Sequence, residues 1–204
     1  MFSLLSGCFE FMLRKEELHV LIVGLDKAGK TTLLERLKTL YTDVPGLEAG
    51  QVVPTGERVG LNLAHFEALG VPLLCWDVGG AAGLRSIWSK YYGECHALLF
   101  CVDAADRGRL EEAKAALDRA LGDRDLYGAP LLVLANKQDV EGAASPAELA
   151  EAFGLGRLDG GRPCSVQAVT ARTGEGVKPA VQWLVENIKK SQRPELIRRR
   201  MLSQ

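Results

Sequence analysis

The chain has 204 residues, of which 47% are hydrophobic and 25% are charged, and its formal net charge is −1 at pH 7. This length suffices for one α/β domain with a sizeable core, and the balanced charge argues against a general affinity for nucleic acid. No stretch of about 18 apolar residues occurs, so no segment is expected to span a membrane. The cysteines form no C-x-x-C pair, which favours free thiols in a reducing compartment; they are Cys8, Cys75, Cys95, Cys101 and Cys164.

Residues 1–15 have the pattern of an amphipathic helix. At about 100° per residue, the apolar side chains fill one continuous arc of roughly 200°. Two interpretations stay open: a helix lying in the plane of a membrane surface, or a helix packed permanently on the domain. The segment has no basic leader and is not expected to be a signal peptide. Because Phe2 stands where a glycine would be needed, N-myristoylation is not expected, and a second membrane tether would be required.

Residues 24–31, Gly-Leu-Asp-Lys-Ala-Gly-Lys-Thr, fit the phosphate-binding pattern G-x-x-x-x-G-K-[ST]. A β-type run precedes them at 18–23 and a helix-type run follows at 31–40. Gly24 and Gly29 let backbone N–H groups approach an anion, and the positive end of the dipole of the following helix is directed at the same anion. The Lys30 ammonium can reach the β- and γ-phosphates, and the Thr31 hydroxyl can ligate Mg²⁺. The other predicted nucleotide-binding members of this region are Asp26, Lys27, Ala28 and Thr32.

Residues 59–66 alternate weakly between apolar and polar, and residues 73–76 are apolar; the short link between them, which contains Gly70, predicts an antiparallel hairpin. The long loop before them, 41–58, is of the kind that tends to be functional. Asp77 ends the hairpin and is followed by Gly79 and Gly80. A carboxylate at the end of a strand suits a Mg²⁺ ligand, although a plain turn is the alternative interpretation.

Asn136-Lys137-Gln138-Asp139 follows a predicted strand at 131–134. The Asp139 carboxylate can accept hydrogen bonds from N1–H and the exocyclic amine of guanine, a donor pair that adenine lacks, and such pairing discriminates strongly. The Lys137 stem can lie along the base, while Asn136 can tie this loop to the phosphate loop. The segment after the last strand, which includes Thr170 and Ala171, is expected to donate a backbone N–H to the base.

Further strands are predicted at 97–102 and 165–169, and further helices at 110–121, 145–153 and 177–188. The expected fold is a doubly wound α/β sheet of six strands, five parallel and one antiparallel, with helices on both faces and nucleotide at the carboxyl ends of the strands. We divide the chain into an N-terminal helix (1–15), one nucleotide-binding domain (16–192) and a basic C-terminal tail (193–204). The tail is either a solvated terminus or a contact with anionic lipid or a partner.

These residues resemble the Arf family of small GTPases, which are P-loop NTPases. The resemblance rests on the phosphate loop, Trp76-Asp77-Val78-Gly79-Gly80, Trp88, Tyr91-Tyr92 and the Asn136–Asp139 motif. The start, Met1-Phe2-x-Leu4-Leu5-Ser6-Gly7, together with Val59-Gly60-Leu61-Asn62, is most similar to the Arf-related subgroup. The resemblance implies GTP, GDP and Mg²⁺ as ligands, and an exchange factor, an activating protein and effectors as partners. It also implies a cytoplasmic, Golgi-associated trafficking switch with an acetylated N-terminus.

By the same resemblance, GTP would order 41–61 and 79–92, with the Gly80 N–H as a γ-phosphate contact. The hairpin would then shift its register and expel the N-terminal helix. The family's threonine that closes over Mg²⁺ is expected at Thr55, although counting back from Asp77 without a gap places Arg58 at its position. Thr31, Thr55 and Asp77 are therefore the predicted metal-site residues.

A second departure concerns catalysis, for which the resemblance implies Lys30, Gly80 and the residue that follows Gly80. Family members usually carry a water-positioning glutamine there, whereas this chain has Ala81. We therefore expect a GTPase whose hydrolysis is slow; the alternative is a GTP-binding scaffold that hardly hydrolyses. A P-loop ATPase or kinase is a third interpretation, against which Asp139 argues.

Overall fold

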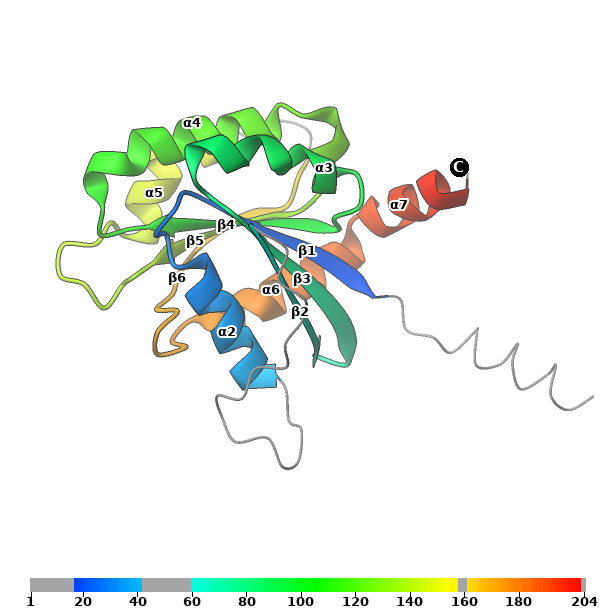
Figure 1. Cartoon of the computed structure of the whole chain (residues 1–204), viewed down its shortest axis with the longest axis horizontal. Coiled ribbons are helices and arrows are strands. Elements are labelled where there is room, and N and C mark those ends of the chain that lie inside the picture. Colours follow the sequence, from blue (N-terminus) through cyan, green and yellow to red (C-terminus); the bar gives the residue numbers. More distant parts are fainter. Residues whose placement is uncertain (1–16, 42–59, 158–160, 203–204) are drawn as a thin grey trace, which may run out of the picture.

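A six-stranded sheet forms the centre of the molecule (Figure 1). The computed structural model describes residues 17–41, 60–157 and 161–202. The order of the strands across the sheet is β2-β3-β1-β4-β5-β6. Their bounds are β1 Leu18–Val23, β2 Leu61–Ala68, β3 Val71–Val78, β4 Ala97–Asp103, β5 Leu131–Asn136 and β6 Cys164–Ala168.

Strand β2 runs antiparallel to its neighbour, while β3, β1, β4, β5 and β6 are parallel. The predicted mixed sheet is therefore confirmed. The central strands β1, β4 and β5 are almost continuously apolar and buried, as is required of parallel strands that are covered on both faces.

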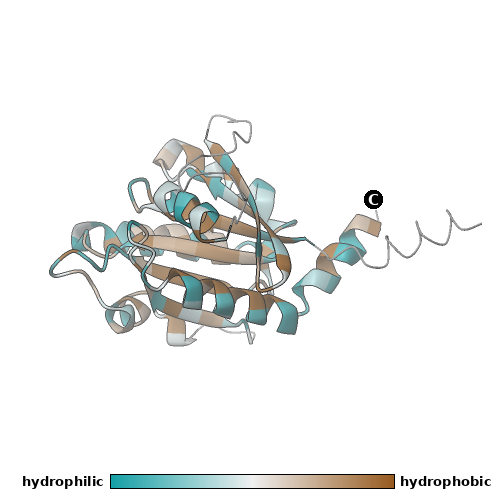
Figure 2. Cartoon of the chain, turned by 90° about the horizontal axis from the view of Figure 1, so that it is seen from below, coloured by the Kyte–Doolittle hydropathy of each residue, from teal (hydrophilic) through white to brown (hydrophobic). Residues whose placement is uncertain are grey.

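Helices cover both faces of the sheet (Figure 1). One hydrophobic core lies beneath α2 and α6, and a second lies beneath α3, α4 and α5. The helices are α2 Lys30–Tyr41, α3 Ser89–Tyr92, α4 Leu110–Leu121, α5 Pro146–Ala152, α6 Val177–Lys190 and α7 Arg193–Leu202, and the 3₁₀ segments are η1 Ala82–Ile87, η2 Arg107–Arg109, η3 Arg124–Leu126 and η4 Leu155–Arg157. Figure 2 shows the strands mostly brown (hydrophobic) and the outer sides of the helices largely teal.

The predicted hairpin is confirmed, and its turn explains how two strands join so tightly. Leu69 and Gly70 form the two-residue loop, with φ of 54° and 72°. Positive φ at both positions is typical of the turn that matches the twist of antiparallel strands. The turn fixes the register, which pairs Asn62 with Asp77.

Local signals predicted α5 well. The Ser145 side chain accepts a hydrogen bond from the Glu148 backbone, and the Glu148 side chain accepts one from the Ser145 backbone, which completes a capping box ahead of Pro146. These bonds, together with Arg107, lower the pKa of Glu148 to about 2.

The segment that we expected to be a basic tail forms helix α7 instead. Its first residue, Arg193, is only 1% exposed. The Arg193 guanidinium donates from Nε to Cys95 O (2.9 Å), from Nη1 to Tyr127 O (3.1 Å) and from Nη2 to Tyr92 O. This residue therefore binds α7 to the body of the domain, and charge counting could not distinguish it from the exposed arginines that follow.

Within the described ranges, no helix is both long enough and apolar enough to cross a membrane. The predicted amphipathic helix at 1–15 and Cys8 lie outside these ranges. Cys75 and Cys101 are buried in the core as predicted.

Candidate nucleotide-binding site

The phosphate loop connects β1 to α2, as the motif requires. Gly24 has a φ of 143°, and a Cβ there would lie 2.1 Å from Cys101 O on β4. Lys27 and Gly29 also have positive φ, of 62° and 92°. Positive φ values turn the chain sharply, and a loop with such conformations that leads into a helix N-terminus is of the kind that binds anions.

Lys30 is the first residue of α2 and is 6% exposed. Its Nζ donates a 2.7 Å hydrogen bond to Leu25 O, within the same loop. Burial lowers the pKa of Lys30, while the nearby Asp77 carboxylate opposes that shift. A bound phosphate would supply further negative charge and favour the ammonium form.

Thr31 and Asp77 meet at the carboxyl end of β3. The Thr31 hydroxyl donates to Asp77 Oδ2 over 2.8 Å, and Asn62 Nδ2 donates to the same oxygen over 3.1 Å. A hydroxyl and a carboxylate are hard oxygen ligands that suit Mg²⁺, which usually binds through few protein groups and keeps several waters. The Thr31 hydroxyl and the Asp77 carboxylate therefore fit Mg²⁺ held jointly with phosphate. Thr55, the other predicted ligand, lies outside the described residues.

Gly80 approaches the phosphate loop so closely that no side chain fits there. A Cβ on Gly80 would lie 2.2 Å from Gly24 O and 2.5 Å from Asp26 N. The preceding residue is held through both of its backbone polar groups, because Gly79 N donates to Gly60 O (2.8 Å) and Trp88 Nε1 donates to Gly79 O (2.9 Å). Trp88 therefore acts as a support for this segment, which explains a tryptophan buried among η1 and α3.

Ala81 is exposed and directly precedes η1. Its methyl group provides neither a donor nor an acceptor for water. The first long polar side chain after it is Arg85, which is already engaged: Nε donates to Gly80 O (2.9 Å) and Nη2 pairs with Glu112 (2.6 Å).

Asn136 connects the predicted base loop to the phosphate loop, as expected. Asn136 Nδ2 donates to Ala28 O over 2.8 Å, and Asn136 Oδ1 accepts from Ala171 N over 3.0 Å. The Thr170 N–H is donated to Glu175 O. The N–H groups of Thr170 and Ala171 thus both bind within the protein, and that of Ala171 holds Asn136; a base contact from this segment stays a prediction.

Lys137 and Asp139 lie beside Asn136 and have ionic partners. Lys137, whose φ is 65°, pairs through Nζ with Asp103 Oδ2 at the end of β4 (2.5 Å). Asp139 Oδ2 accepts from Arg172 Nη2 (2.9 Å), an arginine whose side chain is 78% exposed. A base bound at Asp139 would replace this exposed arginine as the partner of the carboxylate. Thr32, by contrast, is exposed on the first turn of α2, with no polar contact to the base loop among the described residues.

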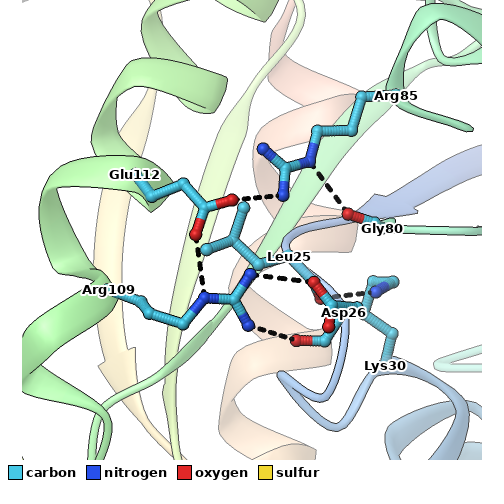
Figure 3. Close-up of polar contacts among 7 residues, drawn as sticks. All are labelled: Leu25, Asp26, Lys30, Gly80, Arg85, Arg109 and Glu112. Carbon is cyan, nitrogen blue, oxygen red and sulfur yellow. Dashed lines mark hydrogen bonds and ion pairs between the residues drawn. The ribbon is translucent and has the colours of Figure 1, made fainter. Parts of the chain in front are cut away.

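Sequence reasoning missed a group of charged residues beside the phosphate loop (Figure 3). Arg109 pairs with both Asp26 and Glu112, each over 2.8 Å. The spacing of Arg109 and Glu112 along the start of α4 indicates a local pair, but no sequence signal indicates that Asp26, 83 positions away, is a partner.

The comparisons with known proteins agree with this geometry. The model of the ADP-ribosylation factor family matches residues 5–188. The chain belongs to this family. Its Arf relatives include ADP-ribosylation factor-related protein 1 of Rattus norvegicus, which is 41% identical over 192 residues and aligns across 91% of this chain and 92% of the relative. ADP-ribosylation factor-like protein 3 of Saccharomyces cerevisiae is 40% identical over 200 residues, covering 95% and 98%.

Among solved structures, the Arl6 BBS3 small GTPase of Trypanosoma brucei, determined with the bound nucleotide analogue GppNp, is similar with a TM-score of 0.72. It is 34% identical, and the match covers 86% of this chain and 99% of that one. The predicted Arf family and small-GTPase fold are thereby confirmed. The chain is an Arf-family small GTPase, a type of protein that binds guanine nucleotide as a switch.

Proposed function

We propose that this chain is a slowly hydrolysing, GTP-operated switch of Golgi vesicle trafficking whose GTP-bound form is long-lived. The observation that carries the proposal is the pairing of an intact binding site with a deficient catalytic position. The phosphate loop, Thr31, Asp77 and the Asn136 loop are all assembled, whereas Ala81 provides no polar group.

Within this proposal each group of residues has its own role. The phosphate loop and Lys30 bind the phosphates, and Asp139 selects guanine. Thr31 and Asp77 would hold Mg²⁺, which neutralises phosphate charge when it is bound. The Gly80 N–H donates a hydrogen bond to the γ-phosphate, which is present in GTP and absent from GDP. No side chain at position 81 orients the attacking water, so one or two factors of ten in rate are lost, each about 1.4 kcal/mol of barrier.

The Golgi location and the membrane contact rest on similarity. The relatives named ADP-ribosylation factor-related protein 1 align with nearly the whole chain, and the sequence of residues 1–15 supports an amphipathic surface helix. An exchange factor, an activating protein and effectors are the expected partners. A truncated chain without residues 1–15 that still requires the same lipids for binding would contradict the membrane part of the proposal.

The test of slow turnover is single-turnover GTP hydrolysis by the full chain and by its Ala81→Gln variant, with bound nucleotide measured by chromatography. We expect Ala81→Gln to hydrolyse about 10- to 100-fold faster and the parent to retain GTP. Ala82→Gln, one position further on, is the matched control and should not accelerate hydrolysis. Equal rates for the parent and Ala81→Gln would overturn the assignment of the deficit to Ala81.

A second candidate function is a scaffold that binds GTP and does not turn it over. The engagement of Arg85 by Gly80 and Glu112 favours it, because the nearest polar side chain is occupied. A parent that converts no measurable GTP over many hours, while Ala81→Gln hydrolyses it, would select the scaffold, whereas slow but measurable conversion by the parent would select the switch.

A further inference from the structure

Glu112 lies between two arginines on the first turn of α4 (Figure 3). Its Oε1 accepts from Arg85 Nη2 over 2.6 Å, and its Oε2 accepts from Arg109 Nε over 2.8 Å. Each carboxylate oxygen thus has its own arginine, and the two arginines belong to different parts of the chain, η1 and η2.

Besides Glu112, Arg85 contacts the segment that precedes η1. Arg85 Nε donates to Gly80 O over 2.9 Å. Because the peptide bond is planar, a fixed Gly80 carbonyl also fixes the direction of the Ala81 N–H. The Gly80 backbone is already pressed against Gly24 and Asp26, so Arg85 acts on the point at which this segment meets the phosphate loop.

Besides Glu112, Arg109 contacts the phosphate loop itself. Arg109 Nη2 donates to Asp26 Oδ1 over 2.8 Å, and Nη1 donates to Asp26 O over 3.4 Å. An aspartate in a phosphate-binding loop would repel the anion that the loop binds. Arg109 neutralises that charge, and it lowers the pKa of Asp26 chiefly through this hydrogen bond.

We propose that Glu112 is a positioning residue that couples the phosphate loop to the Gly80 segment, through Arg109 on one side and Arg85 on the other. The inference rests on GTP binding at this site, and it assigns to Glu112 the positioning of Gly80 for the γ-phosphate, and so a part in the preference for GTP over GDP. Without the carboxylate, two guanidinium groups would face each other with like charge, and both would leave their backbone partners.

A purely structural role predicts something different. Exposed ion pairs between flexible side chains usually contribute little to stability, and Glu112 has a side chain that is 42% exposed. A structural pair would therefore leave nucleotide preference unchanged. Coupling would change the preference for the triphosphate over the diphosphate with little effect on unfolding.

The experiment measures dissociation constants for GppNp and GDP on the full chain, its Glu112→Gln variant and a matched control. Glu195→Gln is that control, because Glu195 on α7 also pairs with two arginines, Arg198 (2.7 Å) and Arg199 (3.0 Å). We expect Glu112→Gln to lower the GppNp-over-GDP preference about tenfold. The unfolding midpoint should stay the same, and Glu195→Gln should match the parent.

A second pair of variants tests the charge argument. Arg109→Gln should weaken GppNp binding, and Asp26→Asn in the same chain should restore most of it, because the uncompensated carboxylate is then gone. An unchanged preference in Glu112→Gln, or an equal loss in Glu195→Gln, would overturn the coupling. This outcome is distinguishable from a failure of the proposed slow turnover, since neither ligand measurement involves hydrolysis. A chain that binds neither nucleotide would overturn both.

Discussion

Asn136 Nδ2 lies 2.8 Å from Ala28 O and so joins the loop at the end of β5 directly to the phosphate loop. Asn136 is 2% exposed, and its other amide atom accepts from Ala171 N. One side chain therefore fixes three loops relative to one another. A nucleotide whose phosphates and base bind to different loops depends on that arrangement.

Asn136→Ala should weaken nucleotide binding and destabilise the fold together. The substitution leaves the buried Ala171 N–H without its partner and removes a donor from Ala28 O, which should cost about 2–4 kcal/mol in the free energy of unfolding. Urea denaturation and GDP titration measure the two effects. Asn187→Ala removes the hydrogen bond that Asn187 Nδ2 donates to Trp183 O within α6 and serves as control; comparable losses in both variants would contradict the special role of Asn136.

Gly80→Ala should lower affinity for GppNp much more than for GDP. A Cβ at this position would lie 2.2 Å from Gly24 O, so the segment must withdraw from the phosphate loop. We expect the ratio of the two affinities to fall by at least about tenfold. At Gly83, within η1, a Cβ would meet no atom within 4 Å, and Gly83→Ala should keep the parent ratio. Unchanged ratios in both variants would show that the close approach has no functional role.

Arg193→Met should release α7 from the domain. The buried carbonyls of Cys95 and Tyr92 and the partly buried carbonyl of Tyr127 lose their donors, and we expect a loss of about 2–4 kcal/mol in unfolding free energy, measured by urea denaturation. Arg199→Met is the control, because that side chain is 73% exposed and pairs only with Glu195 among the contacts described; it should change stability by less than about 0.5 kcal/mol. Equal effects of the two variants would refute the role given to Arg193.

His96 should make stability depend on pH. His96 is 2% exposed, its Nδ1 accepts from His19 N, and burial, with His19 and Arg193 nearby, lowers the pKa of His96 to about 3. An unfolded histidine titrates near 6.5. Between these values the unfolded chain binds the extra proton, so stability falls as pH decreases through that window.

We therefore expect the parent, relative to His96→Gln, to lose up to about 1.4 kcal/mol per pH unit below about pH 6. Urea denaturation at several pH values between 7 and 5 gives both profiles. His65→Gln removes an exposed histidine and should keep the parent's profile. Parallel profiles for the parent and His96→Gln would contradict the assignment.

The sequence predicted the parts of the site that depend on local patterns. The phosphate loop, the hairpin, the capping box at Ser145 and the Asn136 loop each have residue spacing that reflects one local geometry, and tertiary contacts do not change it. Contacts between distant segments could not be predicted in this way. Arg109 contacts Asp26, and Arg193 contacts Cys95, only because of how the helices lie on the sheet. The residue type alone does not distinguish an arginine that makes such contacts from one exposed to solvent.

Guanine selection by Asp139 is the property on which a GTP-operated switch depends most. Dissociation constants of the full chain and its Asp139→Asn variant should be measured for GTP, ATP and xanthosine triphosphate. We predict that the parent prefers GTP and that the variant loses GTP affinity by about 100-fold or more while it gains xanthosine triphosphate, whose 2-oxo group accepts from the new amide. Glu141→Gln, at an exposed carboxylate of the next loop, should behave as the parent. Equal affinity of the parent for ATP and GTP, or an unchanged preference in Asp139→Asn, would contradict guanine selection by this residue.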